Sequence, residues 1–164
     1  CIMKTRSNIL LFVPLFAFLV LSCSSDDTDD LVKVGGPFEI SELAGNWEAT
    51  SANFSDGNAN FLDVIDEGGT VTLTVQSSGR FTLTIDPSDR PSYTTSGEMF
   101  WEKWEGQYYF AIEWANYPGD WDTYGATLNA TTFTINGGFE SGEYDFDNDG
   151  NFELASIRFT FVRV

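Results

Sequence analysis

Residues 70–86 read TVTLTVQSSGRFTLTID, and this stretch decides the class of fold. Apolar side chains alternate with threonines on both sides of the short SSG segment. Alternation with a period of two places the apolar side chains on one face of an extended strand. The stretch therefore predicts strands over 70–76 and 80–86, joined by a hairpin turn at Ser77-Ser78-Gly79.

Short segments of the same kind follow at regular spacing through the rest of the chain. One helical turn is predicted at 41–45, with Ser41 as its N-cap and Gly45 as its stop. The other predicted strands cover 46–53, 107–115, 124–129, 131–136, 139–146 and 152–164. Eight or nine antiparallel strands indicate an all-β domain over 41–164 that is either a sandwich or an up-and-down barrel.

Composition excludes several classes of function. The chain has 164 residues, a formal net charge of −17 and no histidine. Such a negative surface repels phosphate backbones and argues against nucleic-acid partners. Without histidine there is no Ser-His-Asp or Cys-His catalysis and no His-based zinc site. Carboxylate pairs are the one remaining acid–base option, and no pair stands out among 25 acidic residues. We therefore expect a protein that is not an enzyme, with a carboxylate-based hydrolase as the alternative.

The N-terminal segment has the pattern of a secretory leader. Two basic residues precede an apolar run at 9–21, which is 13 residues long. A membrane-spanning helix needs about 20 residues, so this run matches a signal-peptide core. It ends in Leu19-Val20-Leu21-Ser22-Cys23, which resembles the lipobox of bacterial lipoproteins. The resemblance implies a signal peptide over 1–22 and a lipid anchor on Cys23; the alternative is an ordinary secretory signal.

Residues 23–40 are predicted to be an acidic tether and linker. The segment SSDDTDD at 24–30 has the composition of a solvated spacer. It also resembles the acidic export signal of Bacteroidota surface lipoproteins. That resemblance implies an outer-membrane lipoprotein exposed on the cell surface, with the periplasmic face as the alternative.

The entry to the first predicted strand carries a second resemblance. Leu43-Ala44-Gly45-Asn46-Trp47 is similar to the Gly-x-Trp start of lipocalins and of the lipocalin-like domains of Bacteroidota-type lipoproteins. The hairpin at Ser78-Gly79-Arg80-Phe81 resembles one that these domains share, so the likeness covers 41–164. It implies that Trp47 packs across the closed barrel end under an arginine from the last strands. Arg163 follows the inward parity of its strand, and Arg158 is the second choice.

Aromatic residues are concentrated between positions 100 and 124. Rings on loops beside carboxylates suit a glycan platform or the mouth of an apolar pocket. The alternative is that these rings fold back and cap the ends of the barrel. The candidate ligand-contacting residues are Trp101, Trp104, Tyr117, Trp121 and Tyr124.

Residues 145–150 read DFDNDG and match the first half of a calcium loop. Oxygen ligands stand at alternate positions and glycine stands at the sharp turn. Asp145, Asp147 and Asp149 would be the ligands. Because Ser156 occupies the position of the usual bidentate glutamate and no flanking helix is predicted, a polar hairpin turn without a cofactor is preferred.

A connection of about 16 residues between 53 and 70 is long for a compact domain and predicts a lid or a packed flap. We expect a monomeric protein that binds a small apolar or amphipathic molecule in or at the mouth of the barrel. One rival is a carbohydrate-binding or adhesion module that uses the loop tryptophans. The other is a packed barrel with a protein partner, because Phe81, Phe133, Phe159 and Phe161 all face inward.

Overall fold

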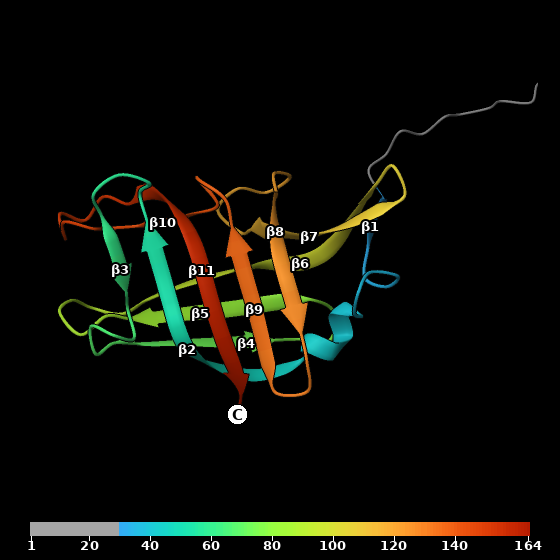
Figure 1. Cartoon of the computed structure of the whole chain (residues 1–164), viewed down its shortest axis with the longest axis horizontal. Helices are drawn as coiled ribbons and strands as arrows, with labels where there is room; N and C mark the ends of the chain where they lie inside the picture. The colour runs from blue at the N-terminus through green and yellow to red at the C-terminus, as the bar shows by residue number, and fades with distance from the viewer. Residues whose placement is uncertain (1–29) are drawn as a thin grey trace, which may run out of the picture.

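The computed structural model describes residues 30–164, so the expectations for the signal peptide and for Cys23 lie outside the described residues. One short 3₁₀ turn, η1 (Ile40–Leu43), is the only helical element of this part of the chain. The rest of its regular structure is β-strand, and eight strands close into an antiparallel barrel (Figure 1). The predicted all-β barrel is therefore confirmed.

The barrel is of the up-and-down type, because each barrel strand pairs with the next one along the chain. Its front wall in Figure 1 holds β2, β11, β9 and β8, and its back wall holds β4 to β7. The barrel strands are β2 (Gly45–Ser55), β4 (Thr70–Val75), β5 (Arg80–Asp86), β6 (Tyr93–Trp104), β7 (Gln107–Trp114), β8 (Asp122–Leu128), β9 (Thr132–Gly137) and β11 (Glu153–Arg163). The additional strands β1 (Asp30–Val32), β3 (Phe61–Asp63) and β10 (Gly142–Tyr144) pair with β6, β2 and β11.

Pairing between β11 and β2 closes the barrel. The register runs from Ser156 opposite Ser55 to Arg163 opposite Trp47, with a bulge between Thr160 and Phe161. A bulge increases the local twist and bend of a strand, which helps a sheet to curve back on itself. This continuous pairing excludes the open sandwich.

Alternation along the strands fills the barrel interior. The apolar side chains of β4 and β5 are at most 4% exposed, while the threonines between them face outward. Phe133, Phe159 and Phe161 are at most 2% exposed. Between the rings of Phe159 and Phe161 and the inward side chains of β4 to β7, a space of only about 10 Å³ remains, which is the limit for one water molecule. The middle of the barrel is packed solid.

Trp47 and Arg163 form the closed end of the barrel. The Trp47 indole is 1% exposed, and its Nε1 donates to the Leu43 carbonyl at 2.8 Å. The Arg163 guanidinium carbon lies 4.1 Å from the centre of the Trp47 ring, a cation–π distance. Its Nη1 and Nη2 donate to the carbonyls of Ala44 and Glu42 at 2.8 and 2.7 Å. One arginine therefore joins the last strand, the tryptophan and η1.

The helical turn and the last hairpin differ from the sequence expectations. Ser41 is not the N-cap: η1 starts after Glu39, whose N–H donates to the Glu42 carboxylate at 3.3 Å. The strand predicted over 139–146 is reduced to β10. Glu140 has a φ of 64°, a left-handed conformation that interrupts an extended strand.

Strand β6 has no counterpart among the predicted strands, although it is the longest in the barrel. Its residues Met99, Phe100 and Trp101 are all buried, so the strand lacks simple alternation there. Both faces are covered, because Phe100 packs on the outside against Trp121 and Trp101 packs inside against Phe110. A strand buried on two sides gives no period-two signal.

The long connection after β2 is a packed flap. Val64 is 1% exposed, Leu62 and Ile65 are half-buried, and Phe61 is 71% exposed. The Asp63 carboxylate accepts hydrogen bonds from the backbone N–H of Ala52 and Ile65 and from the Ser51 hydroxyl. Partial burial raises the pKa of Asp63, but these hydrogen bonds outweigh burial and hold that pKa below its ordinary value.

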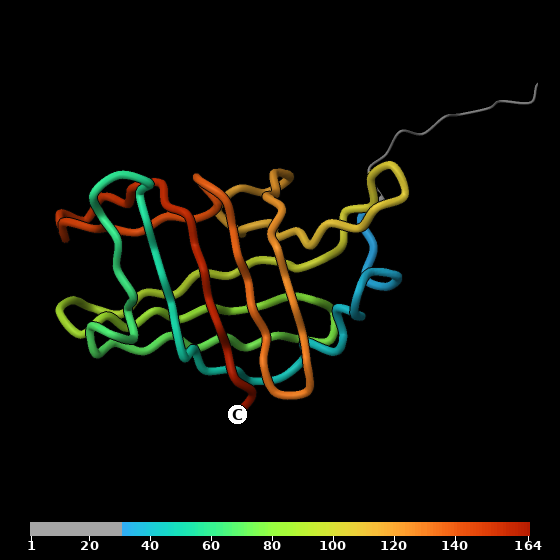
Figure 2. The backbone as a smooth tube through the Cα atoms, in the orientation of Figure 1, coloured from blue at the N-terminus to red at the C-terminus, as the bar shows by residue number. Residues whose placement is uncertain are grey.

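The path of the backbone shows how the ends of the barrel differ. The β6–β7 hairpin extends away from the barrel, beside the start of the described chain (Figure 2).

Residues 30–164 include no helix with the length and hydrophobicity needed to cross a bilayer.

Replacement of Trp47 by alanine tests the closed end. We expect Trp47→Ala to lower the free energy of unfolding by about 3–5 kcal/mol, because it leaves a large cavity and removes the ring under Arg163. Urea unfolding followed by circular dichroism measures this loss. Trp104→Ala is the control, since Trp104 is 55% exposed, and its effect should stay within about 0.5 kcal/mol. Equal stability of the two variants would contradict the prediction.

Candidate functional site

An open cavity of about 300 Å³ lies at the barrel end opposite Trp47. This volume is at the lower limit of small-molecule sites in proteins. The lining combines inward residues near strand ends with residues of the neighbouring loops: Phe54, Leu83, Ile85, Tyr93, Thr94, Thr95, Trp114, Asn116, Tyr117, Gly142, Glu143, Phe152, Ile157 and Phe159.

The cavity has an apolar floor and a polar rim. Leu83, Ile85 and Ile157 are at most 4% exposed and belong to the packed core. They continue the alternating faces of β5 and β11, which is why they point into the barrel. Polar groups come from Asn116 and Glu143, which lie at or beyond strand ends. The arrangement suits a molecule with an apolar body and one polar end.

Tyr117 and Glu143 join two loops across the rim. The Tyr117 hydroxyl donates to Glu143 Oε1 at 2.7 Å, although the tyrosine itself is 50% exposed. This hydrogen bond, together with the negative charge of Glu143, raises the pKa of Tyr117. Glu143 is the only carboxylate in the cavity lining, which contains no lysine or arginine.

A second hydrogen-bonded chain supports the wall behind Trp114. Trp114 Nε1 donates to the Tyr124 hydroxyl at 3.0 Å, and that hydroxyl donates to the Ser141 carbonyl at 2.5 Å. Burial raises the pKa of Tyr124, which is 6% exposed and therefore stays a neutral donor. Tyr124 thus positions Trp114 and the segment before Gly142 without lining the cavity itself.

The aromatic residues singled out from the sequence do not gather in one place. Trp101 is 2% exposed, and its Nε1 donates to the Phe38 carbonyl at 2.9 Å, so it belongs to the core. Trp104 ends β6, about 35 Å along the strand from Tyr93 at the cavity, given about 3.3 Å per residue. Trp121 packs on the outside against Phe100. Of the five candidates, Tyr117 alone lines the cavity.

Several cavity residues were missed in the sequence. Tyr93 begins the strand that was not predicted, and Glu143 lies in a segment predicted as a longer strand. Trp114 lies in the predicted strand 107–115 and is not among the predicted ligand-contacting residues. The sequence does indicate which residues face inward near the ends of alternating strands. This pattern does not tell which end of the barrel is open.

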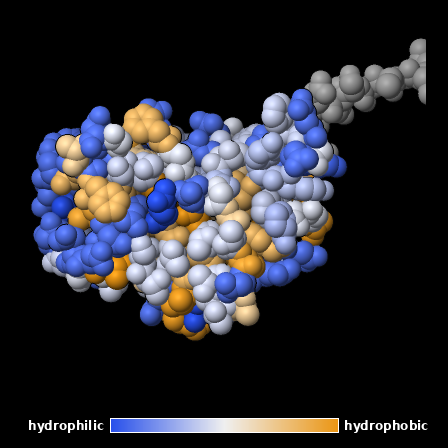
Figure 3. All heavy atoms as spheres, in the orientation of Figure 1, coloured by the Kyte–Doolittle hydropathy of each residue, from blue (hydrophilic) through white to orange (hydrophobic). Residues whose placement is uncertain are grey.

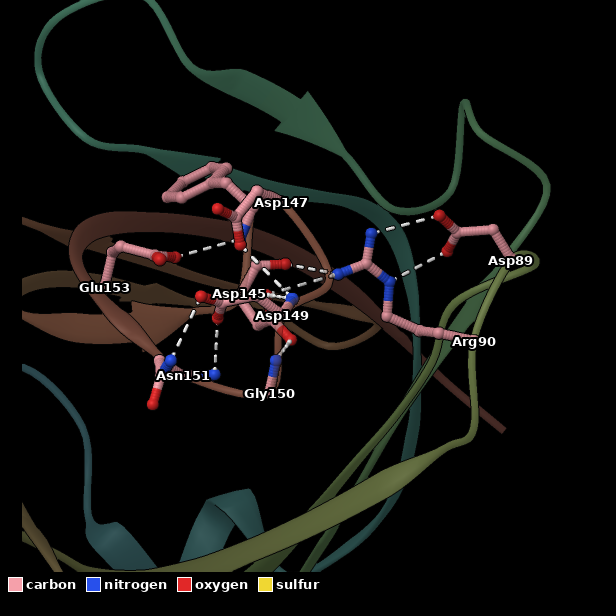
Figure 4. Close-up of polar contacts among 9 residues, drawn as sticks. Asp89, Arg90, Asp145, Asp147, Asp149, Gly150, Asn151 and Glu153 are labelled. Atoms are coloured by element: carbon pink, nitrogen blue, oxygen red, sulfur yellow. Dashed lines mark hydrogen bonds and ion pairs between the residues drawn. The ribbon is translucent and has the colours of Figure 1, made fainter.

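The acidic turn at 145–153 is organised by backbone hydrogen bonds (Figure 4). Asp145 accepts from the N–H groups of Asp149 and Gly150 at 3.1 and 3.0 Å. Asp149 accepts from the N–H and side-chain amide of Asn151, which lowers the pKa of Asp149. Glu153 accepts from the Phe146 N–H at 2.9 Å. These bonds define a tight polar hairpin turn between β10 and β11.

The structure brings the three predicted calcium ligands together and adds Glu153 to them. One oxygen each from Asp145, Asp147, Asp149 and Glu153 lies within 4.8 Å of the others. Glu153 stands at the ninth position from Asp145, which is a ligand position in calcium loops. Arg90 contacts this turn through the Asp145 backbone carbonyl, and its Nη1 lies 4.0 Å from Asp145 Oδ1. Part of the negative charge is therefore neutralised by the protein.

Replacement of Asp145 tests the structural role of the turn. We expect Asp145→Ala to lower the free energy of unfolding by about 1–3 kcal/mol in the presence of chelator, because two backbone donors lose their acceptor. Chemical unfolding measures the change. Asp147→Asn serves as the control, because it keeps an oxygen acceptor for the Asp149 N–H.

The same proteins test the calcium hypothesis. A bound ion would raise the melting temperature with increasing free calcium, and Asp145→Ala would remove that rise. Equal melting temperatures in millimolar calcium and in chelator would leave the turn as a hairpin held by hydrogen bonds alone.

Together, the fold and the cavity define a small β-barrel with one closed end and one open end. No protein-family model, curated protein or solved structure matches this chain. The function is therefore inferred from the residues and geometry of this chain alone.

Proposed function

We propose that this chain is an envelope-anchored lipoprotein that binds a small apolar or amphipathic molecule at the mouth of its barrel. The observation that carries the proposal is the apolar cavity of about 300 Å³ at the open end of a barrel that is otherwise packed. Binding as a monomer, without catalysis, is the simplest use of this geometry.

Two features of the cavity favour a ligand with both apolar and polar parts. The floor of Leu83, Ile85 and Ile157 offers burial from water, which stabilises apolar groups by about 25 cal/mol per Å². Glu143 and Asn116 at the rim supply hydrogen-bonding groups for a polar end of the ligand.

Carbohydrate binding is the second candidate, favoured by a groove on the outer wall. This groove of about 300 Å³ includes Phe61, Asn53, Asn136 and Arg158. A 71% exposed ring beside amide and guanidinium groups has the chemistry that sugar rings need. The tryptophans predicted for this function do not form one platform, because Trp101 is buried, Trp104 packs against Tyr109 and Trp121 packs against Phe100.

Docking of a large protein partner has less support on the face seen in Figure 3. Hydrophobic residues there form separate spots within a mainly polar surface. Interfaces with protein partners more often present a continuous apolar patch.

The anchoring part of the proposal depends on Cys23 and the acidic segment after it. The proposed location is the outer face of the outer membrane. Protease treatment of intact cells should remove the barrel domain from the cell-bound fraction, whereas the periplasmic alternative predicts full protection. Permeabilised cells provide the control that the domain can be cleaved at all.

Filling the cavity tests the binding function. Thr95 is half-buried, faces inward opposite Leu83 and lines the cavity, so Thr95→Trp should occupy the space with little strain. We expect the variant to lose at least about tenfold in affinity for a small amphiphile, with an unfolding free energy within about 1 kcal/mol of the parent. Native mass spectrometry with an envelope lipid extract, followed by calorimetric titration, measures the loss.

Thr82→Trp is the matched control, because Thr82 is exposed on the outward face of β5 and does not line the cavity. Affinity should be unchanged in this variant. Equal binding by both variants would contradict a site inside the barrel mouth. An oligosaccharide adduct that is lost on replacement of Phe61 by alanine would favour the groove on the outer wall.

A further inference from the structure

The charge of the cavity rim restricts the kind of amphiphile that it can hold. Within residues 30–164, Glu143 is the only carboxylate in the lining, and no lysine or arginine lines the cavity to balance it. Its Oε1 accepts one hydrogen bond, from Tyr117, which is half exposed and so leaves the carboxylate close to solvent. A carboxylate has room for further donors, since its two oxygens offer about four acceptor positions.

The acidic groups around the rim have the same sign. Glu113 accepts from the Gly119 N–H at 2.9 Å, in the turn that also holds Tyr117. At the start of β8, burial and the negative charges of Asp120 and Glu140 raise the pKa of Asp122. An apolar wall strengthens a field of one sign inside a cleft. The mouth therefore attracts cations and repels anions.

One basic side chain in a hollow beside the cavity is engaged elsewhere. Arg90 touches the same wall from the other side, where it lies near Tyr93 and Phe152 in an adjacent hollow. Its Nε and Nη2 donate to Asp89 at 2.9 and 3.0 Å, and Nη1 donates to the Asp145 carbonyl. Arg90 is thus held by acidic residues and does not offer a site for an anionic head group.

The rings at the mouth favour the same sign of charge. Trp114 and Tyr117 both line the cavity, and aromatic faces attract cations through their quadrupole. A positive group between these rings and Glu143 would gain from an ion pair and from cation–π attraction together. A carboxylate at this place would meet Glu143 and two electron-rich faces.

We infer that the ligand of the barrel mouth is a small cationic amphiphile, with an ammonium-type head at Glu143 and an apolar body on the floor formed by Leu83, Ile85 and Ile157. A fatty-acid-like carboxylate is disfavoured. At about 30 Å³ for each water-sized group, the cavity of about 300 Å³ holds a body of roughly ten non-hydrogen atoms. The inference rests on the proposed function, because it assigns the chemistry of that same cavity.

Three ligands of nearly equal shape test the inference: 1-naphthylmethylammonium, 1-naphthylmethanol and 1-naphthoate. Octylammonium, octanol and octanoate repeat the comparison with a flexible body. Binding to the barrel domain is measured by calorimetric titration at low salt. We expect the ammonium compound of each series to bind about tenfold more tightly than the carboxylate, with the alcohol between them. Added salt should reduce this ratio, because the rim is close to solvent.

Glu143→Gln separates charge from shape, since glutamine keeps an acceptor for the Tyr117 hydroxyl. In this variant the ratio should fall to about twofold or less, while the affinity for the alcohol is unchanged. Glu105→Gln is the control, because Glu105 lies in the turn after β6, away from the cavity, and the ratio should stay as in the parent.

The outcomes distinguish the inference from the function on which it rests. If no member of either series binds, or if Thr95→Trp binds them equally well, the barrel-mouth function itself is wrong. If the alcohols bind in the cavity but the carboxylates bind as tightly as the ammonium compounds, only the charge preference is overturned. A preference that persists in Glu143→Gln also overturns it, because the rim carboxylate would not be its cause.

Discussion

Pairing between the first and last barrel strands is the constraint on which the rest of the structure depends. The register of β2 and β11 places Arg163 opposite Trp47, and it places the apolar face of β11 against that of β2. A shift by one residue would turn every inward phenylalanine of β11 to the outside. The cation–π contact, the two carbonyl hydrogen bonds from Arg163 and the packed interior all follow from this one register.

The same register makes the two ends of the barrel different. At the Trp47 end, large rings and η1 fill the space between the walls. At the other end, Thr95 and Gly142 stand where larger side chains would close the mouth. Two neighbouring segments are already fixed by hydrogen bonds, the flap by those of Asp63 and the last hairpin by those of Asp145. A cavity therefore remains at this end, where Thr95 and Gly142 are small and the neighbouring flap and hairpin are fixed by their own hydrogen bonds.

The fold was predictable from the sequence to the extent that one face of each strand was buried. Residues 70–86 alternate cleanly and became β4 and β5, with β5 bounded as predicted. Strand β6 was not predictable in this way, because Phe100 and Trp101 are buried on opposite faces. The cavity was less predictable still. Tyr117 and Glu143 are 26 residues apart, and their contact depends on how two loops meet across the mouth.

Closure of the barrel by its last strand also bears on the order in which the chain can fold. The N–H of Val164 donates to the carbonyl of Asn46, so the residue that follows β11 bonds to the start of the first barrel strand. During synthesis, β2 has no permanent neighbour on one edge until all the other barrel strands exist. Contacts between such distant segments form slowly, and until then the open edges of β2 and β9 can pair with other chains. Holding the earlier strands unfolded until β11 has been synthesised would protect the chain from aggregation.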